Sequence, residues 1–142
     1  MEKDYSTDPL DILPAHVRVK LPVQTPCEAA FEYLAQNHPY WLISLIQSRG
    51  LNDVELSFAA EAAGSINKSP YLILLVLSPL LHHHSATVRE GAIYGIVKDI
   101  SMLDDARIKA ELEHLSANDD SPGVRTAAKE ALDYLKNEEK NE

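Results

Sequence analysis

The sequence predicts an all-α domain, folded as a right-handed α-solenoid of stacked helical hairpins. Apolar residues recur at helical spacing along most of the chain, and residues that cap or end helices separate the runs. One segment also repeats, because Val124 follows Val88 by 36 residues and Val54 precedes it by 34 residues. Two helices within each such period are typical of a solenoid, in which every hairpin buries its apolar face against its neighbours.

Periodicity and punctuation place the helices in order. We expect them over residues 25–37, 40–48, 52–65, 69–81, 87–100, 104–118 and 121–137. Each range carries an apolar stripe at the spacing of one helix face. The third range also contains small residues at 59–60 and 62–64, which allow a neighbouring helix to approach closely.

Capping residues set the predicted helix boundaries. Three of them precede a proline, which suits the first helical position: Thr25, Ser69 and Ser121. Two pairs have the spacing of a capping box: Asn52 with Glu55, and Thr87 with Glu90. Gly50 is the expected C-cap of the second helix. Asp104 and Asp105 stand where negative charge stabilises the start of a helix.

The sequence divides into three segments. Residues 1–24 fall outside the repeat, and the alternating residues 16–21 suit an extended N-terminal arm. That arm either lies over the first repeat or pairs as a strand with a partner protein. Residues 25–137 form the repeat domain, and residues 138–142 are a charged tail.

Length and charge narrow the class of function. The 142 residues suit one domain with a sizeable core, and 22 acidic against 13 basic residues give a net charge of −9. Proteins that bind nucleic acid neutralise its phosphates with Lys and Arg, so nucleic acid is a disfavoured partner. The same negative field favours a basic protein partner and speeds its approach.

Several features indicate a cytoplasmic protein. Cys27 is the only cysteine, so the chain has no intramolecular disulfide and no zinc site built from cysteines. The N-terminal residues contain no apolar core of the signal-peptide type. The longest nearly continuous apolar run, Tyr71–Leu81, is too short to span a bilayer, so we expect no membrane partner.

The repeated segment resembles a HEAT repeat of the bacterial HEAT-like kind. Its pattern is V-R-x-x-A-x-x-x-[L/I], and its four positions are occupied twice, by Val88, Arg89, Ala92 and Ile96 and by Val124, Arg125, Ala128 and Leu132. The resemblance covers about residues 25–137. The earlier unit places Val54, Phe58 and Ala62 at the matching positions and departs from the pattern with Glu55 in place of arginine.

The resemblance assigns a structural role to the repeated arginines. In HEAT-like units this arginine ties one repeat to the turn of a neighbour, so Arg89 and Arg125 are expected to be structural. Asp119 or Asp120 is the expected partner of Arg125. Trp41 fits either of two roles, a core residue or a partly exposed interface anchor.

No catalytic motif is present, so we predict that the chain is not an enzyme and uses no cofactor. HEAT-like folds include deoxyhypusine hydroxylases, which use His-Glu pairs, but this chain contains no His-Glu dipeptide. They also include DNA glycosylases with an electropositive groove, which the charge disfavours. A subunit of the bilin-lyase type is the alternative function, because its chemistry leaves little trace in a sequence.

The run His82-His83-His84 is the one candidate metal site. Consecutive residues on a helix point about 100° apart, so three in a row cannot all face one ion. A site would need a carboxylate, or His114, brought close by the stacking of repeats. The run is therefore interpreted as a solvated turn between helices, and we predict no metal site.

These observations lead to a protein-binding module, a scaffold or adaptor, as the predicted function. A specific version is an inhibitor or immunity protein that neutralises a basic toxin. The binding surface is predicted on the outward side of the repeated helices, where tyrosines lie among acids. Its residues are Glu90, Tyr94, Val97, Lys98, Thr126, Glu130, Asp133 and Tyr134. A solvated face without a partner is the competing interpretation, and the oligomeric state is not predicted.

Overall fold

The computed structural model describes residues 27–140, and these residues form helices with no β-strand, which confirms the all-α prediction. The first half contains α2 (Cys27–Asn37), α3 (Pro39–Gln47), α4 (Asp53–Ala63), α5 (Pro70–Leu77) and the 3-10 helix η2 (Ser78–His82). The second half contains α6 (Ala86–Val97), α7 (Ile100–Leu103), α8 (Ala106–Asn118) and α9 (Pro122–Lys140). The predicted arm and the residues up to Pro26 lie outside the described part.

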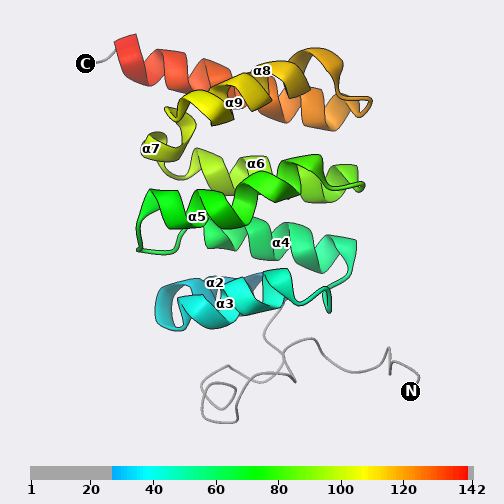
Figure 1. The fold of residues 1–142 in the computed structure, drawn as a ribbon, viewed down its shortest axis with the longest axis vertical. Coiled ribbons are helices and arrows are strands. Elements are labelled where there is room, and N and C mark those ends of the chain that lie inside the picture. The colour runs from blue at the N-terminus through cyan, green and yellow to red at the C-terminus, as the bar shows by residue number, and fades with distance from the viewer. Residues whose placement is uncertain (1–26, 141–142) are drawn as a thin grey trace.

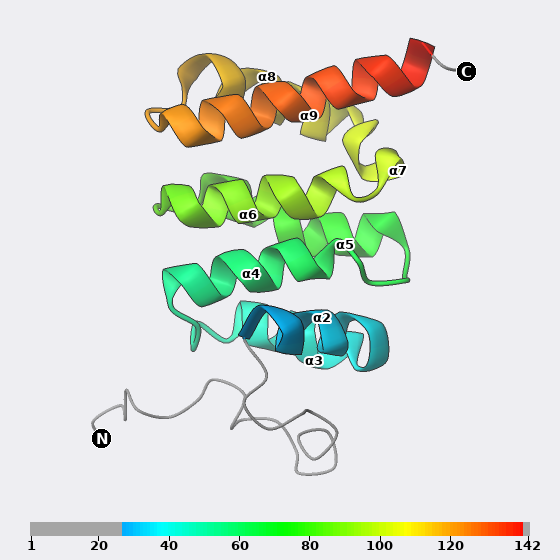
Figure 2. The same ribbon diagram turned by 180° about the vertical axis from the view of Figure 1, so that it is seen from behind.

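The helices stack in two layers along the longest axis of the molecule (Figure 1). One layer contains α3, α5 and α8, which face the viewer in Figure 1. The other contains α2, α4, α6 and α9, and Figure 2 shows this layer from its outer side. Successive members of the second layer contact one another, so α6 lies between α4 and α9.

The core lies between the layers and continues along the stack. Among its fully buried side chains are Phe31, Leu42, Leu77, Ile96 and Leu112. No polar or charged residue is buried in residues 28–140. Burial of apolar surface is therefore the main stabilising term, and polar side chains act at helix ends and at the rims of the layers. None of the helices described is both long and apolar enough to cross a membrane.

Helices α4 and α6 pack against each other at backbone distance. A Cβ atom added to Gly91 would lie 2.5 Å from the carbonyl oxygen of Ser57, and one added to Gly95 would meet the carbonyl oxygen of Ala60. On the α4 side, Ala59 and Ala60 are fully buried. The small residues of 59–64 therefore do allow close approach, and the glycines of α6 complete the contact.

Burial corrects the predicted repeat register in the first unit. Val54 is 56% exposed, so it does not correspond to the buried Val88. A spacing of 33 residues matches buried positions, because Ala59 and Ala63 then correspond to Ala92 and Ile96, and all four are buried. Alanines fill the core side of α4, so the apolar pattern alone did not reveal this one-residue shift.

The capping predictions have mixed outcomes. The Asn52–Glu55 capping box is confirmed, with the Glu55 amide donating to Asn52 Oδ1 at 2.8 Å and the Asn52 amide donating to Glu55 Oε1 at 2.9 Å. The Thr87–Glu90 box is wrong, because α6 begins at Ala86 with Ser85 as its N-cap. The C-cap prediction at Gly50 is also wrong, since Ser48 caps α3 and Arg49 takes the left-handed conformation with φ of 62°.

The remaining differences concern helix ends. The predicted helix over 69–81 is an α-helix up to Leu77 and a 3-10 helix beyond it, where Ser78 and Pro79 stand. A short helix, α7, precedes α8 and was not predicted. Asp105 caps α8 through hydrogen bonds from the amides of Arg107 and Ile108. The last helix continues to Lys140, three residues beyond the predicted boundary at 137.

Candidate functional site

The predicted binding surface lies on the outer side of α6 and α9, which are neighbours in the layer shown in Figure 2. Tyr94 is 43% exposed and Tyr134 is 44% exposed. Thr126, Glu130 and Asp133 are also exposed. The two tyrosines therefore stand among open polar residues on adjacent helices, with much of each ring available to a partner.

Acidic groups from three helices surround Tyr94. The pKa of Tyr94 is raised, first by partial burial and then by the negative charges of Glu90, Glu130 and Glu61. Glu90 belongs to α6, Glu130 to α9 and Glu61 to α4. Glu61 was not predicted as a site residue, because the sequence does not show that α4 continues the same layer. We call Glu61, Tyr94, Thr126, Glu130, Asp133 and Tyr134 the acidic tyrosine face.

Three of the predicted site residues are engaged inside the protein. Lys98 Nζ lies 3.0 Å from Glu32 Oε1 and donates to Ser65 Oγ at 3.0 Å. Val97 is half-buried against the core, and the carboxylate of Glu90 stands close to Gly123 at the start of α9. These residues support the surface from below or from its edge, and the structure does not present them as open contacts.

Arg89 joins α6 to the loop that precedes α9. Its Nε donates to Asp119 Oδ2 at 3.0 Å, one terminal nitrogen donates to Asp119 Oδ1 at 3.1 Å, and the other donates to the carbonyl oxygen of His83 at 2.7 Å. The pKa of Asp119 is lowered, because the hydrogen bonds from the Ser121 amide and Arg89 outweigh a partial burial that acts in the opposite direction. This is the structural role expected for the repeated arginine.

The expected partner of Arg125 is only half right. Arg125 donates to the backbone carbonyl oxygen of Asp119 at 2.6 Å, while the carboxylate of Asp119 pairs with Arg89. Each arginine thus holds the carbonyl oxygen six residues before it, His83 for Arg89 and Asp119 for Arg125. Only Arg89 also reaches the next unit, since α9 is the last helix of the layer.

The three histidines separate into two groups. His82 ends η2, and its Nε2 lies 2.9 Å from Glu111 Oε1 of α8. His83 leaves the helix with an extended backbone, at φ of −62° and ψ of 147°. Its ring stacks on that of His84 at a centroid distance of 4.2 Å. The helical geometry that argues against a shared ligand therefore does not apply to His83 and His84.

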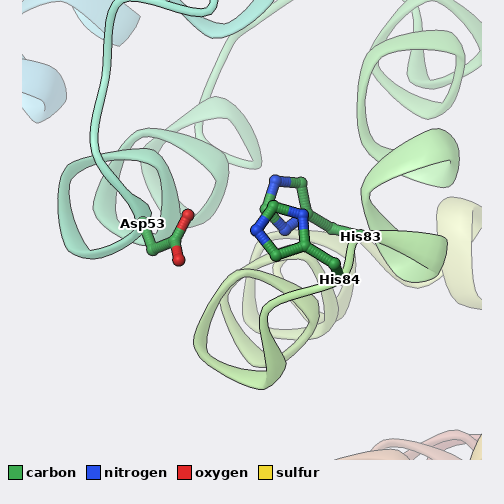
Figure 3. Close-up of side chains that lie close together, drawn as sticks. All are labelled: Asp53, His83 and His84. Atoms are coloured by element: carbon green, nitrogen blue, oxygen red, sulfur yellow. The ribbon is translucent and has the colours of Figure 1, made fainter.

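Asp53, at the start of α4, points toward both of these rings (Figure 3). One ligand atom from each of Asp53, His83 and His84 can be chosen so that the three lie within 4.8 Å of one another. This is the carboxylate that a metal site required and that the sequence did not identify. Thirty residues separate Asp53 from His83 in the chain, so only the packing of α4 beside the loop before α6 brings them together.

His83 favours the neutral imidazole. Its pKa is lowered, first by partial burial and then by the neighbouring His84, against an opposing effect of Asp53. Its Nδ1 accepts a hydrogen bond from the amide of Ser85 at 3.0 Å. Because a backbone amide only donates, Nδ1 carries no proton in this arrangement and the neutral ring is protonated at Nε2.

A groove opens beside the histidines, with a volume of about 740 Å³. Apolar side chains from α3, α4, α5 and η2 form much of its wall, among them Ile46, Leu56 and Leu80. Arg49, Asp53, His83 and His84 also line it. Arg49 is the residue with the left-handed backbone conformation, which is uncommon for a residue other than glycine.

Comparison with known proteins adds no function to this geometry. The chain matches no protein family model, no curated protein and no solved structure. The function is therefore argued from the acidic tyrosine face, the groove and the Asp53–His83–His84 cluster.

Proposed function

We propose that this protein is a non-catalytic protein-binding module of the HEAT-repeat type, and that a basic protein docks on its acidic tyrosine face. The observation that carries the proposal is the convergence of Glu61, Glu90 and Glu130 around the exposed Tyr94. Tyrosine is enriched among residues that dominate binding energy, and surrounding carboxylates complement a basic surface. The exposure of Tyr134 on the neighbouring helix extends the same chemistry along the stack.

The two-layer stack supports the solenoid part of the proposal. Layers in which each helix contacts only its sequential neighbours are what a right-handed α-solenoid of HEAT-like hairpins requires. The repeated arginine contacts to His83 and Asp119 are 36 residues apart, as the repeated sequence pattern is. In such a fold one layer presents a continuous surface of parallel helices, and here that surface carries the acidic tyrosine face.

The partner is expected to be a basic protein encountered in the cytoplasm. A net charge of −9 raises the association rate with a positively charged protein, and it lowers the rate for nucleic acid. An inhibitor or immunity protein that neutralises a basic toxin fits this chemistry. The adaptor and the inhibitor differ in the partner and share the binding surface.

A subunit of an enzyme of the bilin-lyase type is the second candidate, and the groove is the observation that favours it. Its volume of about 740 Å³ is in the range of small-molecule pockets, which is about 300–1,000 Å³. Its apolar wall and polar rim also suit an organic ligand. A chromophore or other small molecule that copurifies with the protein would support this candidate over protein binding.

Affinity capture from the native host separates the two candidates. The bait variants are the double charge reversal Glu130→Lys with Asp133→Lys, and the matched reversal Asp104→Lys with Glu113→Lys on the opposite layer. All four residues are exposed, and each pair changes the net charge from −9 to −5, since −9 + 4 = −5. Glu90 is left in place because it contacts the start of α9.

The parent and the matched control should capture a stoichiometric basic protein, and the variant in α9 should lose it. Binding to the parent should weaken as salt rises, because the surface charges are screened. Equal capture by both double variants would show that the acidic tyrosine face is not the site. Circular dichroism of each bait checks that the variants remain helical.

A further inference from the structure

We propose that Asp53, His83 and His84 bind a divalent transition-metal ion, which fastens α4 to the loop that precedes α6. The three side chains come from two consecutive helical pairs and lie together at the rim of the groove (Figure 3). One ligand atom from each lies within 4.8 Å of the other two. A metal bound there would join two units that the chain itself connects only through α5 and η2.

The free state of the cluster leaves its donors available. Within residues 27–140, neither the Asp53 carboxylate nor the His84 ring takes part in a side-chain hydrogen bond. His82, in contrast, is paired with Glu111. The cluster therefore differs from the rest of the histidine run, because its side chains converge without satisfying one another.

The donor set selects the class of metal. Two imidazole nitrogens with one carboxylate oxygen suit Zn²⁺, Ni²⁺, Co²⁺ or Cu²⁺, whereas Ca²⁺ and Mg²⁺ prefer oxygen ligands throughout. Positive charge nearby strengthens this selection. Arg49 lines the same groove, and Arg89 donates to the carbonyl oxygen of His83, so a hard cation held by charge alone is disfavoured.

Neutral imidazole is the form that binds a metal, and the environment of His83 favours it at neutral pH. Partial burial and the adjacent His84 lower the pKa of His83, so the metal does not have to displace a proton held by charge. Asp53 supplies the negative charge that a dication requires. Three protein ligands leave at least one position of a tetrahedral ion open, and the groove lies beside it.

Binding requires two local adjustments. Ligands around zinc at about 2.0–2.1 Å stand about 3.3 Å from one another, so the exposed Asp53 side chain has to move inward. The Ser85 amide also loses its acceptor on either route. A metal on Nδ1 of His83 displaces it directly, and a metal on Nε2 moves the ring proton to Nδ1. These adjustments lower the affinity and provide a specific signal.

Zinc titration of the full-length protein tests the proposal. The protein carries no polyhistidine tag, and Cys27→Ser removes the only thiol as a competing ligand. Zinc chloride should raise the melting temperature in a saturable manner, since a ligand of the native state stabilises it by RT ln(1 + [L]/Kd). His84→Gln should weaken zinc binding by roughly tenfold or more, as should Asp53→Asn, whereas His82→Gln should leave it unchanged.

The amide of Ser85 provides an independent readout. In the zinc-bound protein its hydrogen exchange should accelerate and its NMR resonance should shift, because the bond to His83 Nδ1 is broken. Saturable stabilisation that disappears in His84→Gln, together with the Ser85 shift, supports the site. Absence of stabilisation at 100-fold excess zinc overturns the proposal, and so does stabilisation that survives in His84→Gln or leaves Ser85 unchanged.

Discussion

The two junctions along the layer of α4, α6 and α9 use different means to hold neighbouring helices. Between α6 and α9, Arg89 reaches Asp119 through two hydrogen bonds between permanently charged groups. Between α4 and α6, the backbones meet at Gly91 and Gly95, and the polar groups at the rim are Asp53, His83 and His84.

The difference shows how one architectural position can serve two purposes. In each junction the start of one helix faces the loop before the next helix of the layer. The ion pair of Arg89 satisfies its groups internally, so it adds rigidity and leaves nothing for a ligand. Tight glycine packing stabilises the other junction without polar help, which allows its rim residues to remain unpaired and available.

Removal of the ion pair should have the largest effect. Arg89→Ala leaves the carboxylate of Asp119, whose side chain is 6% exposed, without its cationic partner. Loss of one member of a buried pair costs about 3–5 kcal/mol of the free energy of unfolding. Chemical denaturation measures this loss. Arg125→Ala is the matched control and should cost less, because Arg125 holds only a carbonyl oxygen. Equal losses would erase the distinction drawn for Arg89.

Substitution of the glycines should reveal the tightness of the α4–α6 junction. Gly95→Ala places a methyl group against the carbonyl oxygen of Ala60, and backbone cannot rotate away. We expect a loss of roughly 1–3 kcal/mol in the free energy of unfolding.

Gly123→Ala is the control at the other junction. There the added Cβ meets only the carboxylate of Glu90, which is the end of a flexible side chain. Because alanine also favours the helical state by about 1 kcal/mol over glycine, this variant should be neutral or slightly stabilising. Thermal or chemical denaturation of both variants decides the point. A Gly95→Ala protein as stable as Gly123→Ala would mean that α4 and α6 are not in backbone contact.

Acidification should separate the junctions with the smallest effect. The pKa of His83 is lowered from 6.5, so the native state binds fewer protons than the unfolded state, and stability falls as the pH drops below about 6.5. The pKa of Asp119 is lowered from 3.8, so its contribution is complete above that pH and is lost only as the pH falls through the lower native value.

His83→Asn isolates the histidine contribution, because the amide oxygen can still accept the bond from Ser85. Between pH 7 and about pH 5 its stability should decline less than that of the parent, in urea denaturation at each pH. An identical decline in the two proteins would show that His83 does not couple this junction to pH.

Local signals in the sequence were sufficient for most of the helices. The Asn52–Glu55 box and the helix starts at Pro70 and Pro122 depend on neighbours in the chain. The box at Thr87 failed because the start of α6 depends on distant groups. Arg89 holds the carbonyl oxygen of His83, and the extended His83 directs the chain into a helix that begins at Ala86.

The sequence by itself determined the all-α class, the repeated arginines and the tyrosines among acids, because these follow from helical spacing and local hydrogen bonds. Only the tertiary structure decided which groups meet across the layers. It placed Glu61 beside Tyr94, gave Asp119 to Arg89, and brought Asp53 to His83 and His84. The physical reason is that one residue of shift between stacked helices changes every side-chain contact, while leaving the apolar pattern of each helix almost the same.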